Sequence, residues 1–134
     1  MKPKANPVWD PYQASCPSRV VLARIADKWT VLVVGRLAEG TKRFGELRRE
    51  LGGVSQKMLT QTLRALEADG LVNRRVYASV PPKVEYSLTT LGRTLIDLLD
   101  RVRRWAEEHT DAVRAVQAKR RTRRGGTTAE ARDR

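Results

Sequence analysis

Polar side chains recur at helical spacing in the middle of the sequence, opposite an apolar stripe. They are Lys57, Thr60, Gln61 and Arg64, and the stripe is Leu59, Leu63 and Leu66. In the major groove of DNA a glutamine amide pairs bidentately with adenine, and a lysine or arginine with guanine. We therefore interpret Gln61 as a candidate adenine contact and Arg64 or Lys57 as a candidate guanine contact. The alternative is an ordinary solvated helix face, but between residues 55 and 65 this face carries two cations and no acid.

Further polar residues surround this stretch. Ser55, Gln56 and Thr60 lie at the start of the expected helix, where free backbone amides favour phosphate binding, so we expect them to hold phosphates or bases. Arg74, Arg75 and Lys83 follow on segments of alternating pattern and are expected to lie along the phosphate backbone or reach the minor groove. Arg43 is a further phosphate candidate, and simple solvation is its alternative role.

The elements that must position these residues follow from periodicity. A helix with Ser55 as N-cap runs to Gly70, and a shorter one, RFGELRREL, precedes it and ends at Gly52-Gly53. The apolar period then changes to two in LVNRRVY and KVEYSL, which predicts two half-buried strands joined by a loop over 78–82. Earlier helical stripes occur at 21–26 and 29–37, and Gly35 inside the second predicts close packing of a neighbour. The predicted fold is mainly α with a small β-hairpin, a winged helix-turn-helix with a long C-terminal dimerisation helix.

That last helix is expected from about residue 89 to 116 or beyond. Its apolar positions are separated by alternating steps of four and three, which is a heptad seam. They are Leu91, Leu95, Leu98, Val102, Trp105, His109, Ala112 and Val116. A helix of about 40 Å exceeds what the small core needs to cover, so we expect the seam to meet a second chain, with Leu95, Leu98, Val102 and Trp105 at its centre. The alternative is one helix lying on its own core.

Composition narrows the function. The net charge of +12 favours a polyanionic partner, and the excess sits at residues 41–83 and 117–134, whereas 84–116 carries five basic and six acidic residues. One cysteine and one histidine make a structural zinc site improbable, and no phosphate loop or acid-base cluster is present. We expect no enzymatic activity, no cofactor and no metal. The longest apolar runs are too short to cross a bilayer, which predicts a soluble cytoplasmic protein.

We divide the chain into three parts. Residues 1–17 form a proline-rich N-terminal arm, expected to be extended, which either covers a partner subunit or stays floppy. Residues 18–117 form the winged helix-turn-helix domain, including the dimerisation helix 89–117. Residues 118–134 form a basic tail that we expect to be disordered.

The sequence from Cys16 to about Trp105 closely resembles the HxlR-type branch of the MarR-like bacterial regulators. The resemblance rests on CPSRVVLARIADKWTVLVVGRL, RFGELRREL, VSQKMLTQTLRALEADGLVNRRVY and PPKVEYSLTTLGRTL. It implies a homodimer built from the N-terminal arm and the last helix, which binds double-stranded DNA at a palindromic operator through two recognition helices and two wings. Many proteins of this family also sense oxidants or electrophiles through a cysteine just before the first helix, a position that Cys16 matches.

The residues around Cys16 are compatible with this role. If the first helix starts at Pro17, Cys16 is its N-cap, and the helix amides and the nearby Arg19 favour the reactive thiolate. An exposed arm would give oxidants access to it, and an inert buried cysteine is the alternative. Beside sequence-specific regulation of transcription, two other functions remain open. They are an architectural, nucleoid-type DNA-binding protein, which the basic tail favours, and a winged-helix module that binds only protein.

Overall fold

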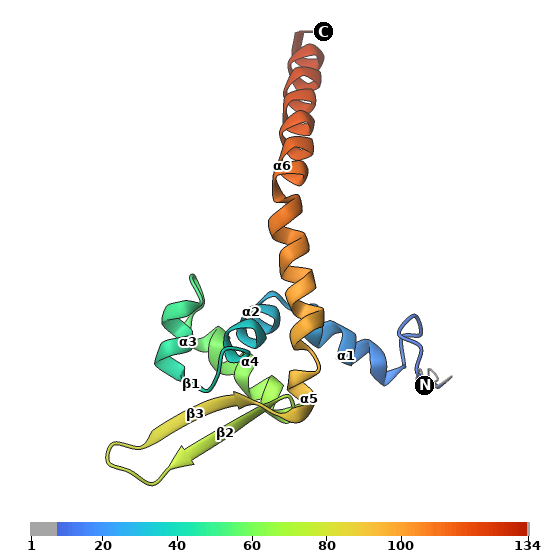
Figure 1. The fold of residues 1–134 in the computed structure, drawn as a ribbon. Helices are drawn as coiled ribbons and strands as arrows, with labels where there is room; N and C mark the ends of the chain where they lie inside the picture. Colours follow the sequence, from blue (N-terminus) through green and yellow to red (C-terminus); the bar gives the residue numbers. More distant parts are fainter. Residues whose placement is uncertain (1–7, 134) are drawn as a thin grey trace. The chain divides into compact units, whose positions relative to one another are not determined.

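The order of elements confirms the predicted winged helix-turn-helix (Figure 1). The computed structural model describes residues 8–133, with side chains described to residue 125. The chain divides after Asp100 into two compact units, which are considered separately. The elements are α1 (Pro17–Ile25), α2 (Lys28–Leu37), β1 (Lys42–Arg43), α3 (Phe44–Glu50), α4 (Gln56–Ala68), β2 (Val72–Tyr77), β3 (Lys83–Leu88), α5 (Thr90–Arg93) and α6 (Ile96–Asp133).

The core of the first unit forms where the apolar stripes of α2, α3 and α4 meet the sheet. Leu47, Leu59 and Leu66 are completely buried, as are Val33 and Val34 of α2. Side-chain caps fix where the helices begin: Asp27 accepts the amide of Trp29 at 2.7 Å, and Ser55 accepts that of Met58 at 3.0 Å. The Ser55 cap and the inward leucines of α4 were both predicted from sequence.

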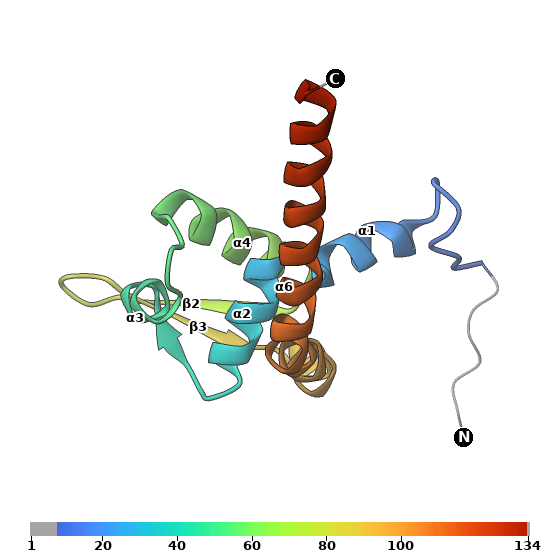
Figure 2. The ribbon, with the colours of Figure 1, turned by 90° about the horizontal axis from the view of Figure 1, so that it is seen from above.

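The sheet has three strands in the order β1-β3-β2, all antiparallel. The two long strands were predicted, but the two-residue β1 is too short to show a period of its own. Its pairing of Lys42 with Tyr86 ties the helix-turn-helix to the hairpin. The loop between β2 and β3 extends beyond α3 and α4 in Figures 1 and 2. It is less buried than its alternation suggested, because only Val72 of β2 is buried and Val76 is 54% exposed.

The predicted last helix is broken near its start. Thr89 caps α5 by accepting the amide of Gly92, and its hydroxyl donates to the carbonyl of Gly70 at 2.6 Å. A turn at residues 94–95 separates α5 from α6. The break lets Leu95, Ile96 and Leu99 pack on the core, so the seam is not one uninterrupted helix from residue 91.

Two apolar surfaces stay uncovered in the single chain. Helix α1 has no buried residue, and Val20 and Val21 are 67% and 62% exposed. Of the stripe expected there, Ile25 packs half-buried against this chain's own core. On α6 the exposed apolar residues are Leu98, Val102, Trp105, Val113 and Val116.

The segment before α1 is turned rather than extended. The amide of Gln13 donates to the carbonyl of Asp10, and that of Cys16 to the carbonyl of Gln13. Arg19 holds the loop from α1 by donating to the carbonyls of Pro11 at 3.0 Å and Tyr12 at 3.2 Å. The aromatic residues of the arm, Trp9 and Tyr12, are exposed. Residues 1–7 of the predicted arm lie outside the described residues.

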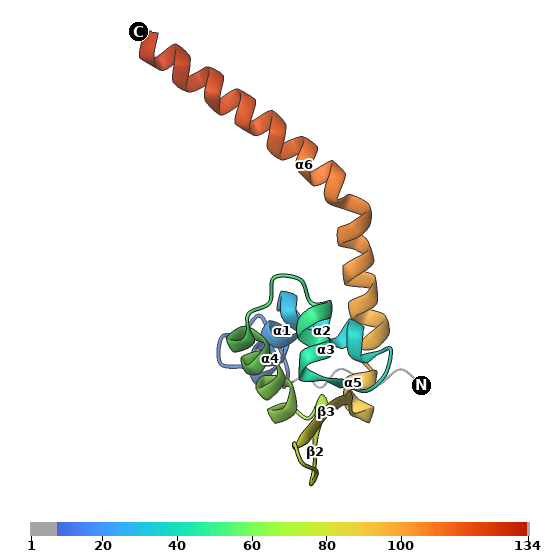
Figure 3. The same cartoon turned by 90° about the vertical axis from the view of Figure 1, so that its left-hand side faces the viewer.

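The basic tail also differs from its expectation, because α6 continues through it to Asp133 (Figure 3). Disorder was predicted for residues 118–134. One physical reason is that alanine, lysine and arginine, which make up most of residues 118–124, are strong helix formers, and extending an existing helix carries no nucleation cost. Over the described part of the chain, we find no helix that combines the length and apolar character needed to cross a membrane.

Two glycines predict opposite effects on stability. A Cβ on Gly92 would overlap the carbonyl oxygen of Leu71, so Gly92→Ala should lower the free energy of unfolding by at least about 2 kcal/mol. A Cβ on Gly35 meets nothing within 4 Å, which corrects the expected close packing there, so Gly35→Ala should raise it by roughly 0.5–1 kcal/mol. Urea unfolding followed by circular dichroism measures both, and equal effects would contradict the packing described.

Candidate nucleic-acid interface

The exposed face of α4 carries the polar side chains singled out from the sequence. Gln56, Lys57, Gln61 and Arg64 are exposed, and Thr60 is half-buried beside them. The leucines on the other side fix this orientation. The hydroxyl of Ser55 caps the helix. The backbone of Ser55 and the other amides in the first turn of α4 are therefore the groups that stay available to bind a ligand.

Arg74 lies on the side of the sheet that faces α4. In an antiparallel pair, residues in register share a face, and Arg74 is in register with Tyr86. An open hollow of about 460 Å³ lies beside this pair, between one side of α4 and the sheet. Its lining consists of Gln56, Thr60, Leu63, Arg64 and Glu67 of α4 with Phe44, Arg74 and Tyr86. The structure therefore places Arg74 and Arg64 around one hollow, which the rings of Phe44 and Tyr86 also line.

The other basic residues gather on the opposite face of the sheet. Arg43 and Arg75 are both in register with Glu85 of β3, one from each neighbouring strand. Lys83 forms an ion pair with Glu85 at 2.9 Å. The ring of Tyr77 lies under both Arg75 and Lys83, with Arg75 Cζ and Lys83 Nζ at 4.8 and 5.1 Å from its centroid. The wing cations named from the sequence are thus divided between two faces, with Glu85 at the centre of the outer one.

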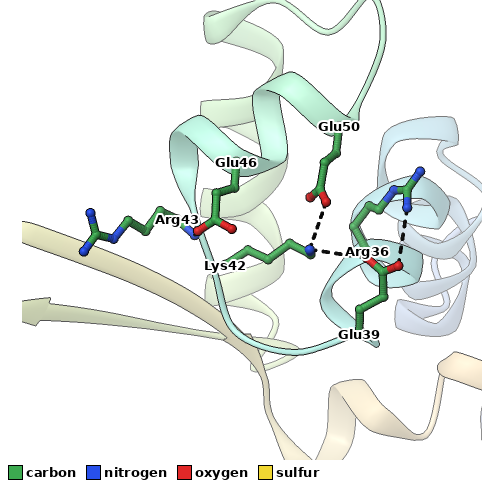
Figure 4. A network of polar contacts seen from close by, with 6 residues as sticks. All are labelled: Arg36, Glu39, Lys42, Arg43, Glu46 and Glu50. Carbon is green, nitrogen blue, oxygen red and sulfur yellow. Dashed lines mark hydrogen bonds and ion pairs between the residues drawn. The ribbon is translucent and has the colours of Figure 1, made fainter.

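Lys42 is a positioning residue that the sequence did not reveal. Its ammonium binds Glu50 at 3.0 Å and Glu39 at 3.3 Å, and its side chain is only 12% exposed. The hydrogen bond that Lys42 donates to Glu50 is the main cause of a raised Lys42 pKa, which burial opposes and the bond to Glu39 supports. Figure 4 shows this cluster, with the neighbouring Arg43 pointing away from it. No spacing rule links these partners, because they meet through a turn and a strand rather than along one helix.

The candidate dimerisation residues differ in their environment. Leu95 packs half-buried against the core of its own chain, whereas Leu98 is 48% exposed. In the second unit Val102 and Trp105 are 49% and 59% exposed. The Trp105 ring stacks on His109 with centroids 4.4 Å apart, and His109 Nδ1 lies 2.8 Å from the Trp105 carbonyl.

Cys16 is the N-cap of α1, as predicted, but it is buried rather than accessible, with 6% of its surface exposed. The turn over residues 8–15 covers it. The Asp10 amide donates to Sγ at 3.0 Å, and Ser18 Oγ lies 3.0 Å from Sγ. The hydrogen bond with the Ser18 side chain is the main cause of a lowered Cys16 pKa, which the backbone amides of Ser18 and Asp10 support and burial opposes.

A helix-turn-helix whose second helix exposes a polar, basic face, followed by a hairpin wing, defines the winged helix-turn-helix class of DNA-binding proteins. The family model described as HxlR-like helix-turn-helix matches residues 24–114. The chain belongs to this family and is a transcriptional regulator with a helix-turn-helix.

Relatives and solved structures agree with this assignment. The HTH-type transcriptional regulator YtfH of Escherichia coli K12 is 48% identical over 109 residues, which cover 81% of this chain and 86% of that protein. The solved structure of the transcriptional regulator ytfH from Salmonella typhimurium has a TM-score of 0.76 at 46% identity, covering 81% of this chain and 97% of that one. The redox regulator HypR is also similar. Its reduced form has a TM-score of 0.67 at 44% identity, covering 74% of this chain and 98% of that one. Its oxidised form has a TM-score of 0.64 at 47% identity, covering 69% of this chain and 96% of that one.

The position of Glu85 leads to a prediction about charge. Because this carboxylate neutralises the cations of the outer face, Glu85→Gln should raise the affinity for any duplex several-fold at low salt and steepen its salt dependence. Fluorescence anisotropy against salt concentration measures this. Glu39→Gln, which removes the same charge beside Lys42, is the matched control and should change DNA affinity less. Equal gains from both variants would mean that only net charge matters.

Proposed function

We propose that this protein is a homodimeric, non-enzymatic regulator of transcription that binds a palindromic operator in double-stranded DNA and responds to oxidants through Cys16. The observation that carries the DNA-binding part is the face of α4, whose exposed side chains combine a bidentate amide with cations. A helix of this kind fits the major groove. In the complex, Gln61 contacts adenine, and Arg64 or Lys57 contacts guanine.

The remaining candidate residues hold the duplex in place. Gln56, Thr60 and the backbone at Ser55 contact phosphates or bases at the start of α4. Arg74, which lines the same hollow as Arg64, holds the phosphate backbone. Arg43, Arg75 and Lys83 follow the phosphate backbone from the outer face of the wing.

The dimer follows from apolar surface that the single chain leaves exposed. Side chains such as Val20, Val21, Val102 and Trp105 are about half exposed or more, and exposed apolar surface of this extent marks an interaction site. A second copy supplies a matching surface, and two recognition helices then lie roughly 34–36 Å apart on one face of the DNA. A protein that sediments as a monomer at micromolar concentration would contradict this assembly.

The basic segment of α6 favours a second candidate, an architectural protein that coats DNA without sequence preference. The amide of Gln61 argues against it, because binding by charge alone needs no bidentate amide. Footprinting distinguishes the two, since a regulator protects one palindrome and an architectural protein gives diffuse coverage.

The base contact of Arg64 gives the first test of this function. Arg64→Ala should weaken binding to the operator by about 1–3 kcal/mol and binding to random duplex much less. Lys83→Ala should weaken both alike and lower the salt slope by about one. Titrations of operator and random DNA at several salt concentrations provide the comparison. Equal losses on both DNAs for Arg64→Ala would refute base recognition by this residue.

The redox response rests on the environment of Cys16. Its thiolate is favoured by the hydrogen bond with Ser18 and the amide of Asp10, and the similar protein HypR is named a redox regulator. Because the sulfur is buried, the turn over residues 8–15 must open before it reacts. With one cysteine per chain, the products are a sulfenic acid, a mixed disulfide with a small thiol, or a bridge between subunits.

The Cys16 response is tested with diamide and a small thiol. Diamide accepts two electrons and two protons from the two thiols, and Cys16 and the small thiol join as a mixed disulfide. Treatment should change the operator affinity of the wild type several-fold and leave Cys16→Ser unchanged. The lowered pKa also predicts that alkylation of Cys16 reaches half its maximal rate at a pH below that of free cysteine, and that Ser18→Ala moves this midpoint up. Identical oxidant responses of wild type and Cys16→Ser would exclude the switch.

A further inference from the structure

The C-terminal end of α4 carries charges of the unfavourable sign for a helix end. Its last turn contains Glu67 and no basic residue, and Asp69 follows as the C-cap. A helix C-terminus has a partial negative charge, so carboxylates are unfavourable there and cations are favourable. The composition of this turn therefore favours a cation from another element.

Arg24 of α1 supplies that cation. Its Nε donates to Oδ2 of Asp69 at 2.7 Å, across 45 positions of the sequence. The two side chains are 35% and 38% exposed, and an ion pair this accessible to solvent adds little to the free energy of unfolding. A short, charge-assisted hydrogen bond is nevertheless directional. The pair therefore fixes the position of one helix end against the other more than it stabilises the fold.

Helix α1 is attached to its own chain near its C-terminal end. Ile25 packs half-buried against the core, next to Arg24, whereas Val20 and Val21 are exposed. The proposed function places these valines in an interface between two subunits. A partner that binds this surface also determines where α1 lies, and the ion pair with Asp69 carries that position to α4.

The side chains proposed as base contacts lie far enough from Asp69 to amplify a tilt of α4. Asp69 follows Arg64 by five residues and Lys57 by twelve, which corresponds to roughly 8 and 18 Å along the helix axis. A tilt of about 10° around the Asp69 end would move the backbone at Lys57 by about 3 Å. Such a displacement is enough to break a hydrogen bond to a base.

We propose that Arg24 is a positioning residue for DNA recognition, because α1 sets the orientation of α4 through the ion pair of Arg24 with Asp69. This inference rests on the proposed function, in which α4 contacts bases and α1 belongs to the interface between subunits. The competing role for Arg24 is direct binding to a phosphate. Asp69 distinguishes the two roles. Removing its carboxylate strengthens DNA binding if only charge matters, but weakens recognition if the ion pair holds α4 in place.

The test measures discrimination, which is the ratio of the affinities for the operator found by footprinting and for a random duplex. Full-length wild type is compared with Arg24→Gln, with Asp69→Asn, and with the double exchange of Arg24→Asp and Asp69→Arg, which reverses the pair and keeps the net charge. Arg36→Gln is the matched control, because it removes an arginine from an exposed ion pair of α2, with Glu39 at 3.4 Å. Fluorescence anisotropy gives the affinities, and sedimentation and urea unfolding are followed for each variant.

We expect each single variant of the pair to reduce discrimination at least about threefold. Asp69→Asn should do so by lowering the operator affinity, although it removes a negative charge. The double exchange should restore discrimination, and Arg36→Gln should leave it unchanged. The urea midpoint of each variant should stay close to that of the wild type, because the ion pair contributes little to stability.

Unchanged discrimination in Asp69→Asn would overturn the proposal. So would a double exchange that discriminates no better than the single variants, or an equal loss in Arg36→Gln. A loss that appears only together with a lowered urea midpoint or a changed sedimentation would also overturn it, because Arg24 would then serve the fold or the dimer rather than the orientation of α4. Failure of the proposed function looks different, because the wild type itself would then bind operator and random DNA alike.

Discussion

Burial of the leucine stripe of α4 against α2 and the sheet is the constraint on which the rest of this structure depends. Leu59, Leu63 and Leu66 are 0–2% exposed. A helix that buries one side in the core exposes the opposite side to solvent. Lys57, Gln61 and Arg64 therefore face solvent as a consequence of packing. A change that loosens this core would tilt α4 and displace the side chains that we propose as base contacts, without altering any of them.

The sheet adds a second constraint, since alternate residues of a strand point to opposite faces. Arg74 and Arg75, which are neighbours in sequence, therefore lie on different faces of the sheet. Arg74 lines the hollow beside α4, and Arg75 lies over the Tyr77 ring next to Glu85. The Lys42 ion pairs hold the short β1 against the end of α3. This attachment keeps the wing in register with the helix-turn-helix, so both parts can meet one duplex.

Surface that the single chain leaves apolar links the fold to the regulation that we propose. The turn that covers Cys16 is held by Arg19 of α1, and α1 itself exposes Val20 and Val21. Chemistry at the sulfur must disturb this turn, because Sγ accepts the amide of Asp10 within it. A modification of one atom would thereby reach a surface that we propose is shared between subunits.

Local features of this protein could be predicted from the order of its residues. Periodicity located α4, β2 and β3, Ser55 was recognised as a cap, and the polar face of α4 followed from the leucine spacing, because each of these depends on residues within one or two turns. Tertiary packing was needed to establish the pairing of Lys42 with Tyr86, the turn at residues 94–95, the burial of Cys16 and the register that places Arg43 and Arg75 beside Glu85. These features join residues that are distant in the chain or depend on what packs above them, and a periodic pattern carries no information about either.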